Sequence, residues 1–220
     1  MRQKSDTYIP ALSHNWLTPL YDSLVGWTMP EYAFKLRLIE QARIKSNHFV
    51  LDLGCGTGTL TRLIKKVHSD ATVIGIDGDD KILGIAKRKA NESGSNVTFQ
   101  QAMAFQLPYV DASFDRALSS LVFHHLTRDN KLRALKEMHR VLRAGGELHI
   151  ADFGKPHNLL MRLASFPLRV FDRSRTTVDN VKGLMPELIR DAGFVEVRES
   201  ARYMTIFGTL SLFMARQVNI

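Results

Sequence analysis

Hydrophobic and polar positions along the chain follow two alternating periods. Short apolar runs of the length expected for buried strands occur at residues 49–53, 71–76, 96–101, 113–122 and 147–152. Between them, apolar residues recur every three or four positions, as in helices that bury one face, at residues 59–67, 80–91 and 129–142. Strands that alternate with helices predict a parallel sheet with helices on both faces.

The last third of the chain departs from this alternation. A helical pattern at residues 178–192 leads into two extended runs, 194–206 and 209–217, which are separated by Gly208. No helix fits between these runs, so we expect them to pair as an antiparallel hairpin at one edge of the sheet. The whole pattern predicts one α/β domain over residues 1–220, doubly wound around a mostly parallel sheet of seven strands.

Two segments flank this repeating core. Residues 1–45 hold many large apolar side chains and a helical pattern from about residue 30, so we expect a helical arm over the core. Residues 155–192 form a second insertion, whose first part, 155–175, is both apolar and basic. That part is either a cap helix with a buried apolar face, or a surface for a lipid-like acceptor or an anionic membrane.

Composition narrows the class of protein. Of the 220 residues, 45% are hydrophobic and 24% charged, which is typical of a soluble globular protein. The single cysteine, Cys55, excludes a disulfide within the chain and any cluster of thiolates. The eight histidines show no pairing on one helix face, so we predict no metal. We see no signal-like or membrane-spanning run and expect a cytoplasmic protein, at most peripheral to a membrane.

The net charge of +8 indicates either an acidic partner or a solvated surface with surplus cations. Nucleic acid, anionic lipid and a phosphorylated small molecule are all acidic partners. No appended RNA-binding module or interleaved basic and aromatic patch is present, which disfavours nucleic acid. The oligomeric state remains open.

The most informative stretch is Asp52-Leu53-Gly54-Cys55-Gly56-Thr57-Gly58, where a predicted strand breaks into glycines before a predicted helix. This arrangement binds nucleoside-containing ligands at the carboxyl edge of a parallel sheet. A dinucleotide fingerprint would place its third glycine at position 59, which is a threonine here. The loop therefore predicts a nucleoside ligand other than a dinucleotide.

Asp77 ends the next predicted strand, 19 residues beyond Gly58. An acid about 20 residues after the glycine turn grips the ribose hydroxyls of a bound nucleoside. The alternative is that Asp77 caps the following helix, although Asp79 and Asp80 are also placed to do so. We favour the ribose role.

The stretch D-L-G-C-G-T-G resembles the S-adenosylmethionine site of class I methyltransferases. Five further stretches agree: I-G-I-D at 74–77, L-P at 107–108, S-F-D at 113–115, S-S-L-V-F-H-H-L at 119–126 and V-L-R-A-G-G-E-L-H-I at 141–150. Within that superfamily the chain is similar to the branch of quinone-ring and phospholipid methyltransferases. The resemblance implies a Rossmann-like methyltransferase fold, with S-adenosyl-L-methionine as cofactor and S-adenosyl-L-homocysteine as product.

The resemblance also implies the cofactor-binding residues. They comprise a loop beneath the methionine part, a ribose-binding acid with two neighbours, an adenine-binding turn and a strand end facing the transferred methyl group. In this chain they are Asp52, Gly54, Cys55, Gly56, Thr57, Gly58, Asp77, Gly78, Asp79, Met103, Ala104, Phe105, Ser119 and Ser120. The family usually has an acid where this chain has Met103, so adenine recognition would rest on apolar contacts and backbone groups near Ala104 and Phe105.

Methyl transfer is an in-line displacement that depends mainly on positioning, and a base is needed only when the nucleophile must lose a proton. His124, followed by His125, stands at the end of a predicted strand and is the preferred base. The alternative is a loop histidine bonded to backbone. Tyr21 is expected to form part of a lid over the cofactor. Cys55, inside the glycine loop, is interpreted as structural.

A small, apolar acceptor fits these features best, either a quinone-ring precursor or a phospholipid amine. A ring carbon flanked by a hydroxyl would benefit from a base, whereas a neutral amine needs only desolvation. Two other functions stay open: an RNA methyltransferase, and a cofactor-binding protein of this fold without catalytic activity.

Overall fold

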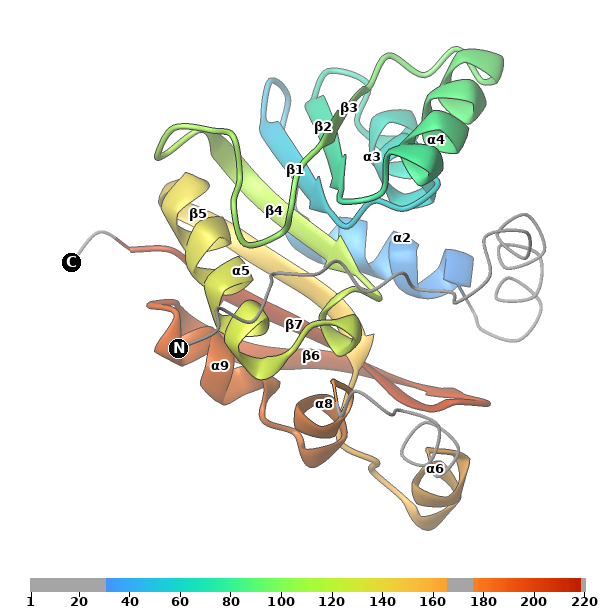
Figure 1. Ribbon diagram of the computed structural model, residues 1–220, viewed down its shortest axis with the longest axis vertical. Helices are drawn as coiled ribbons and strands as arrows, with labels where there is room; N and C mark the ends of the chain where they lie inside the picture. Colours follow the sequence, from blue (N-terminus) through green and yellow to red (C-terminus); the bar gives the residue numbers. More distant parts are fainter. Residues whose placement is uncertain (1–30, 166–175, 219–220) are drawn as a thin grey trace, which may run out of the picture.

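A seven-stranded sheet forms the centre of the computed structural model, which describes residues 31–165 and 176–218 (Figure 1). The strand order is β3-β2-β1-β4-β5-β7-β6. Neighbouring strands from β3 to β5 are parallel, whereas β7 runs antiparallel to both β5 and β6. The predicted fold, a mostly parallel sheet with a C-terminal hairpin, is confirmed. The strands are β1 (Phe49–Leu53), β2 (Thr72–Asp77), β3 (Thr98–Gln101), β4 (Phe114–Ser120), β5 (Leu142–Phe153), β6 (Val195–Thr205) and β7 (Gly208–Arg216).

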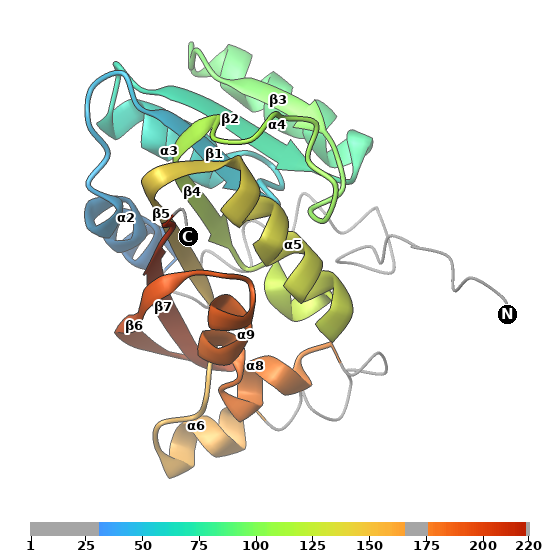
Figure 2. The ribbon, with the colours of Figure 1, turned by 90° about the vertical axis from the view of Figure 1, so that its left-hand side faces the viewer.

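Helices cover both faces of this sheet (Figure 2). The described helical segments are α2 (Glu31–Ala42), α3 (Thr59–Val67), α4 (Asp80–Glu92), η2 (Phe123–His125), α5 (Arg128–Val141), α6 (Leu159–Ala164), α8 (Val178–Lys182) and α9 (Met185–Asp191). In β1, Val50 packs with α2 and α3, whereas Leu51 and Leu53 pack with α5 and α9. This alternation follows from the two-residue period of a strand, and it divides the core into two layers.

The sequence patterns place some boundaries correctly and others wrongly. The predicted limits of β1 and α3 are confirmed. The predicted helix over 178–192 is wrong, because Gly183 adopts a left-handed conformation with φ of 78° and ends α8 before α9 begins. The strand predicted at 147–152 is longer in the structure, because β5 begins at Leu142 and includes Gly145 and Gly146.

The two flanking segments are only partly described. Residues 1–30, including Tyr21 and its predicted lid, and residues 166–175 lie outside the described residues. Within the remainder, α6 packs beside the β6–β7 hairpin. Over residues 31–165 and 176–218, no helix has the length and apolar character needed to cross a membrane. The same residues contain no group of three His, Cys, Asp or Glu side chains suited to holding a metal ion.

Candidate active site

The glycine loop joins β1 to α3 and uses its three glycines differently. Gly54, Gly56 and Gly58 all have positive φ, of 69°, 54° and 77°. A Cβ atom on Gly54 would lie 2.2 Å from a methyl carbon of Val122, and one on Gly58 would lie 2.7 Å from the ring of Phe99. A Cβ on Gly56 would meet nothing within 4 Å. The outer glycines therefore permit close internal packing, and the middle one faces open space.

Asp77 holds the glycine loop from the end of β2. Its Oδ2 accepts a hydrogen bond from the backbone N–H of Gly56 at 2.9 Å, and its Oδ1 accepts one from Asp79 at 3.0 Å. Burial raises the pKa of the Asp77 carboxyl, while these backbone bonds act to lower it. Asp79, not Asp77, caps α4 by accepting from the backbone N–H groups of Lys81 and Ile82. The helix-cap alternative for Asp77 is therefore wrong.

Asp52 lies beneath the loop with only 1% of its surface exposed. Its Oδ2 accepts a hydrogen bond from the Thr61 hydroxyl at 2.6 Å, and its Oδ1 has no hydrogen-bond partner in the described part of the chain. Burial raises the pKa of the Asp52 carboxyl from an ordinary value of 3.8 to about 6, although the Thr61 bond opposes this. Ionising this buried carboxyl group, at the base of the site, therefore destabilises the folded protein.

Cys55 is buried in the same loop. Its backbone N–H donates to the carbonyl of Ile76 at 2.9 Å, which ties the loop to β2. Burial raises the pKa of the Cys55 thiol, so the group stays protonated and is a poor nucleophile at neutral pH. This environment fits a structural cysteine.

Helix α5 fixes the turn that contains Met103, Ala104 and Phe105. The backbone N–H of Leu107 donates to Oε2 of Glu137 at 2.7 Å, and Arg140 donates to the carbonyl oxygens of Leu107 and Tyr109. The Arg133 guanidinium lies 4.4 Å from the centre of the Phe105 ring. The predicted adenine-binding turn is therefore anchored at both its backbone and its aromatic side chain.

The two serines at the end of β4 have different environments. Ser119 is fully buried and its hydroxyl donates to the carbonyl oxygen of Leu53 at 2.9 Å, which joins β4 to β1. The hydroxyl oxygen of Ser120 is buried without a hydrogen-bond partner among the described residues. Of the two, Ser120 thus has the hydroxyl available for a ligand, and the cofactor roles of both residues stay predictions.

His124 forms a side-chain pair with Asp152, which ends the neighbouring strand β5. The His124 Nδ1 and Asp152 Oδ1 atoms are 2.8 Å apart, and both residues are buried. The rings of Phe153 and His125 flank the imidazole, with centroids 4.9 Å and 3.9 Å from that of His124. The histidine is therefore bonded to a carboxylate and not to backbone.

Asp152 is held as a carboxylate by the turn after β4. Its Oδ2 accepts from the backbone N–H groups of Val122, Phe123 and His124, and its Oδ1 accepts from that of Phe153. Burial alone would raise its pKa, but the attraction and hydrogen bond of His124 and the Phe153 bond hold the pKa below its ordinary value. An ionised carboxylate only accepts hydrogen bonds, so Nδ1 of His124 carries a proton, and Nε2 is the nitrogen on which a neutral imidazole has its lone pair.

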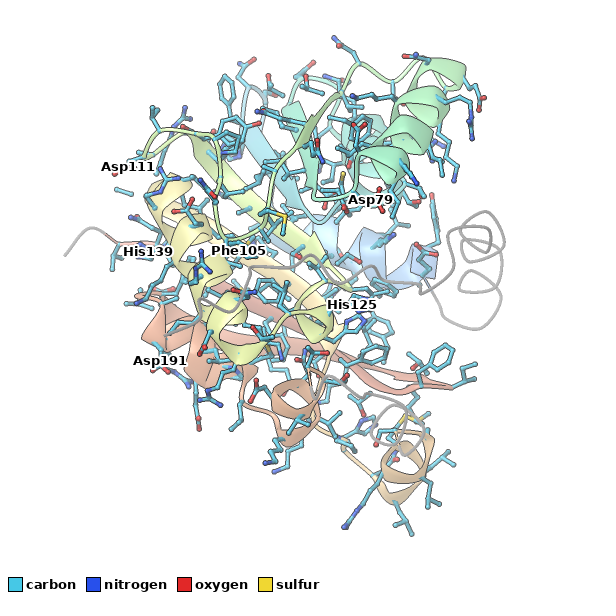
Figure 3. All side chains as sticks on the ribbon, in the orientation of Figure 1. Asp79, Phe105, Asp111, His125, His139 and Asp191 are labelled. Carbon is cyan, nitrogen blue, oxygen red and sulfur yellow. The ribbon has the colours of Figure 1, made fainter. Side chains whose placement is uncertain are left out.

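Sequence reasoning missed Asp152, which lies 28 residues beyond His124. One sequence feature could have identified it. The apolar run of β5 ends in a single acid, and parallel neighbours β4 and β5 bring their carboxyl ends to the same edge. Figure 3 labels one residue in the chain that follows each of three strands: Asp79 after β2, Phe105 after β3 and His125 after β4.

The residues present fit a nucleoside-bearing cofactor at this edge. Open space above Gly56 allows a ligand to approach the backbone, and Asp77 stands beside it at the end of β2. Asp52 and Ser120 each keep a buried oxygen without a partner in the described part of the chain. Both residues lie near the carboxyl ends of the neighbouring strands β1 and β4, beside the glycine loop.

Comparisons with known proteins agree with this geometry. The sequence profile of a family described as a methyltransferase domain matches residues 50–146. An uncharacterized methyltransferase of Synechocystis sp. is 31% identical over 180 residues, which are 81% of this chain and 80% of that protein. A demethylmenaquinone methyltransferase of Thermus thermophilus is 36% identical over 123 residues, or 56% of this chain and 55% of that protein. The match thus spans about half the length of the Thermus protein.

A solved structure shares the fold at low sequence identity. Phosphoethanolamine N-methyltransferase 2 of Haemonchus contortus, in complex with S-adenosyl-L-methionine, superposes with a TM-score of 0.71 at 16% identity. The superposition covers 86% of this chain and 53% of that chain. At this identity the likeness concerns the fold alone.

Proposed function

This chain belongs to the class I S-adenosylmethionine-dependent methyltransferases, and we propose on that premise that it methylates a small apolar acceptor of the quinone-ring type. The observation that carries this proposal is the His124–Asp152 pair. It stands two residues beyond Val122, whose side chain packs against Gly54 of the glycine loop. A base is therefore held next to the expected position of the methyl donor.

Each group in the pair has a separate task. When bound, S-adenosyl-L-methionine supplies an electrophilic methyl group on a sulfonium. Nε2 of His124 takes the proton of a ring hydroxyl, which raises the electron density at the adjacent ring carbon. The cofactor, held by the glycine loop and Asp77, would supply its methyl group to that carbon and leave as S-adenosyl-L-homocysteine. The hydrogen of that carbon would pass as a proton to solvent, and protonated His124 would return its own proton to the ring oxygen, which restores the aromatic hydroxyl. Asp152 is a positioning residue that orients the imidazole and stabilises its protonated form.

The name of the Thermus relative supports a quinone-related acceptor, because it is a demethylmenaquinone methyltransferase. A phospholipid amine has less support, since a neutral amine gains little from a histidine base. The buried pair of His124 and Asp152, called the dyad below, also favours an enzyme over a protein that only binds the cofactor. It provides a base, which binding alone would not require.

Transfer of a labelled methyl group tests the proposal directly. Purified protein with labelled S-adenosyl-L-methionine is offered a demethylated naphthoquinol, a phospholipid with a primary amine, or bulk RNA in parallel reactions. We expect label in the quinol and loss of that label in His124→Ala. Label in RNA or phospholipid instead would contradict the acceptor assignment, and cofactor binding without transfer to any of these would favour a binding protein.

A further inference from the structure

Large apolar side chains on the described surface gather at one end of the molecule. Nine such residues are exposed in the described ranges, and five of them belong to α6 and to the β6–β7 hairpin. We call this group the α6–hairpin face: Leu159, Leu160, Leu163, Met204 and Ile206, which are 72%, 63%, 65%, 57% and 57% exposed. Exposed apolar clusters of this kind mark interaction surfaces.

The α6–hairpin face is part of the packed structure. Met161, on the opposite side of α6, is 4% exposed, and Ser165 at the end of the helix packs against Gly208 in the hairpin turn. Asn158 donates to the sulfur of Met204 at 3.6 Å. Figure 1 shows α6 beside the free end of the hairpin. The three leucines thus point outward because the helix is already anchored by its other side.

Positive charge accompanies this apolar face. Lys155 and Arg162 are both exposed, on the segment before α6 and on the helix itself. Residues 153–165 and 203–209, which build the face and its margin, contain no aspartate or glutamate. Apolar side chains accompanied by cations, with no acid in these two ranges, match the surface of a membrane that contains anionic lipids.

The chain segment that leads into the α6–hairpin face begins beside the dyad. Phe153, the last residue of β5, places its ring 4.9 Å from that of His124, and Lys155 follows two residues later. We propose that the α6–hairpin face docks the protein onto a bilayer surface containing anionic lipid, with the leucines among the acyl chains and Lys155 and Arg162 near phosphates. Docking brings β5, which carries Asp152, close to the membrane that holds an apolar acceptor. This consequence rests on the proposed function, but the docking itself does not.

Sedimentation with vesicles tests the docking. Sucrose-loaded vesicles of phosphatidylcholine, with or without phosphatidylglycerol, are spun with the full chain at low and high salt. We expect binding to the anionic vesicles and at least about a tenfold loss in the triple variant L159Q/L160Q/L163Q, since three side chains lose their apolar burial. Val110→Gln is the matched control, because Val110 is 79% exposed but lies outside the face; it should bind as the unaltered protein does.

A second pair of variants tests the charge. K155E/R162E should remove the preference for anionic vesicles, whereas Lys87→Glu, which reverses an exposed charge on α4, should keep it. Circular dichroism and cofactor affinity are measured on every variant. These two measurements depend neither on methyl transfer nor on docking. A variant that folds and binds the cofactor but no longer sediments with vesicles therefore supports the docking proposal, even if no acceptor is methylated.

Two outcomes would overturn the docking proposal. The first is an unaltered protein that does not sediment with anionic vesicles, or a triple variant that sediments equally well. The second is a light-scattering mass of two copies that falls to one in the triple variant, because the face would then be covered by a second copy of this chain.

Discussion

In the glycine-loop region, residues 50–80, the groups offered to a ligand are mainly backbone after β1 with one acid from β2, whereas in the dyad region, residues 119–153 around the His124–Asp152 pair, they are side chains from the turn after β4 and the end of β5. The glycine-loop region presents mainly backbone, shaped by three glycines and held by Asp77. The dyad region presents side chains that meet only in the folded protein. A site for one shared cofactor can be a local motif, while a site for a particular acceptor depends on tertiary contacts.

The largest expected effect separates packing from ligand access within the glycine loop. Gly54→Ala forces a Cβ against Val122 at positive φ and should lower the free energy of unfolding by about 3 kcal/mol or more. Gly56→Ala meets no neighbouring atom and should lower it by only about 1 to 2 kcal/mol, yet weaken cofactor binding strongly. Urea unfolding and isothermal titration measure the two quantities. Equal stability losses would erase the distinction between the glycines.

Asp77→Ala should weaken cofactor affinity about a hundredfold, because the variant loses both the carboxylate expected to bind ribose and the acceptor for the backbone N–H of Gly56. Asp80→Ala, which removes an exposed carboxylate at the start of α4, is the matched control and should change affinity little. Titration with S-adenosyl-L-methionine and with S-adenosyl-L-homocysteine measures both. An unchanged affinity in Asp77→Ala would remove the ribose role.

His124→Ala should lower kcat on a ring acceptor by about a hundredfold and leave cofactor affinity nearly unchanged, since its expected role begins after binding. Gln at the same position preserves some volume but not the base and should be equally slow. Stopped assays with labelled cofactor give kcat, and titration gives affinity. Full activity in either variant would leave His124 as part of the local packing, and the dyad region would lose its distinct chemistry.

The smallest effect concerns Asp52, which connects stability to pH. Its raised pKa means that between about pH 4 and pH 6 the unfolded chain ionises while the folded protein keeps the proton, so folding weakens as pH rises. Asp52→Asn cannot ionise and should be about 2 kcal/mol more stable than the unaltered protein at pH 8, with little difference near pH 4. Urea unfolding across this range measures the gap. A gap that does not grow with pH would contradict the buried, high-pKa carboxylate.

Features with a local sequence pattern could be predicted from the sequence, whereas contacts between strands could not. The limits of β1 and α3 were predictable because a buried strand, a glycine turn and an amphipathic helix all leave local patterns. The split at Gly183 was not, since one glycine within a helical pattern is often tolerated. His124 could be proposed from its position after β4, whereas Asp152 was recognisable only as an acid near the end of β5 and not as the partner of His124. Pairing with Asp152 depends on strand neighbours that only the sheet order reveals.

The contact between Gly54 and Val122 also constrains how this protein can change over generations. A side chain at position 54 would occupy the space that Val122 already fills, so the two sites are expected to behave epistatically. A smaller residue at 122 would have to come before a larger one at 54 to avoid this clash, and the positive φ at 54 would still disfavour the larger residue. Since Val122 stands two residues before His124, sequence change in the turn that carries His124 is coupled to the glycine loop.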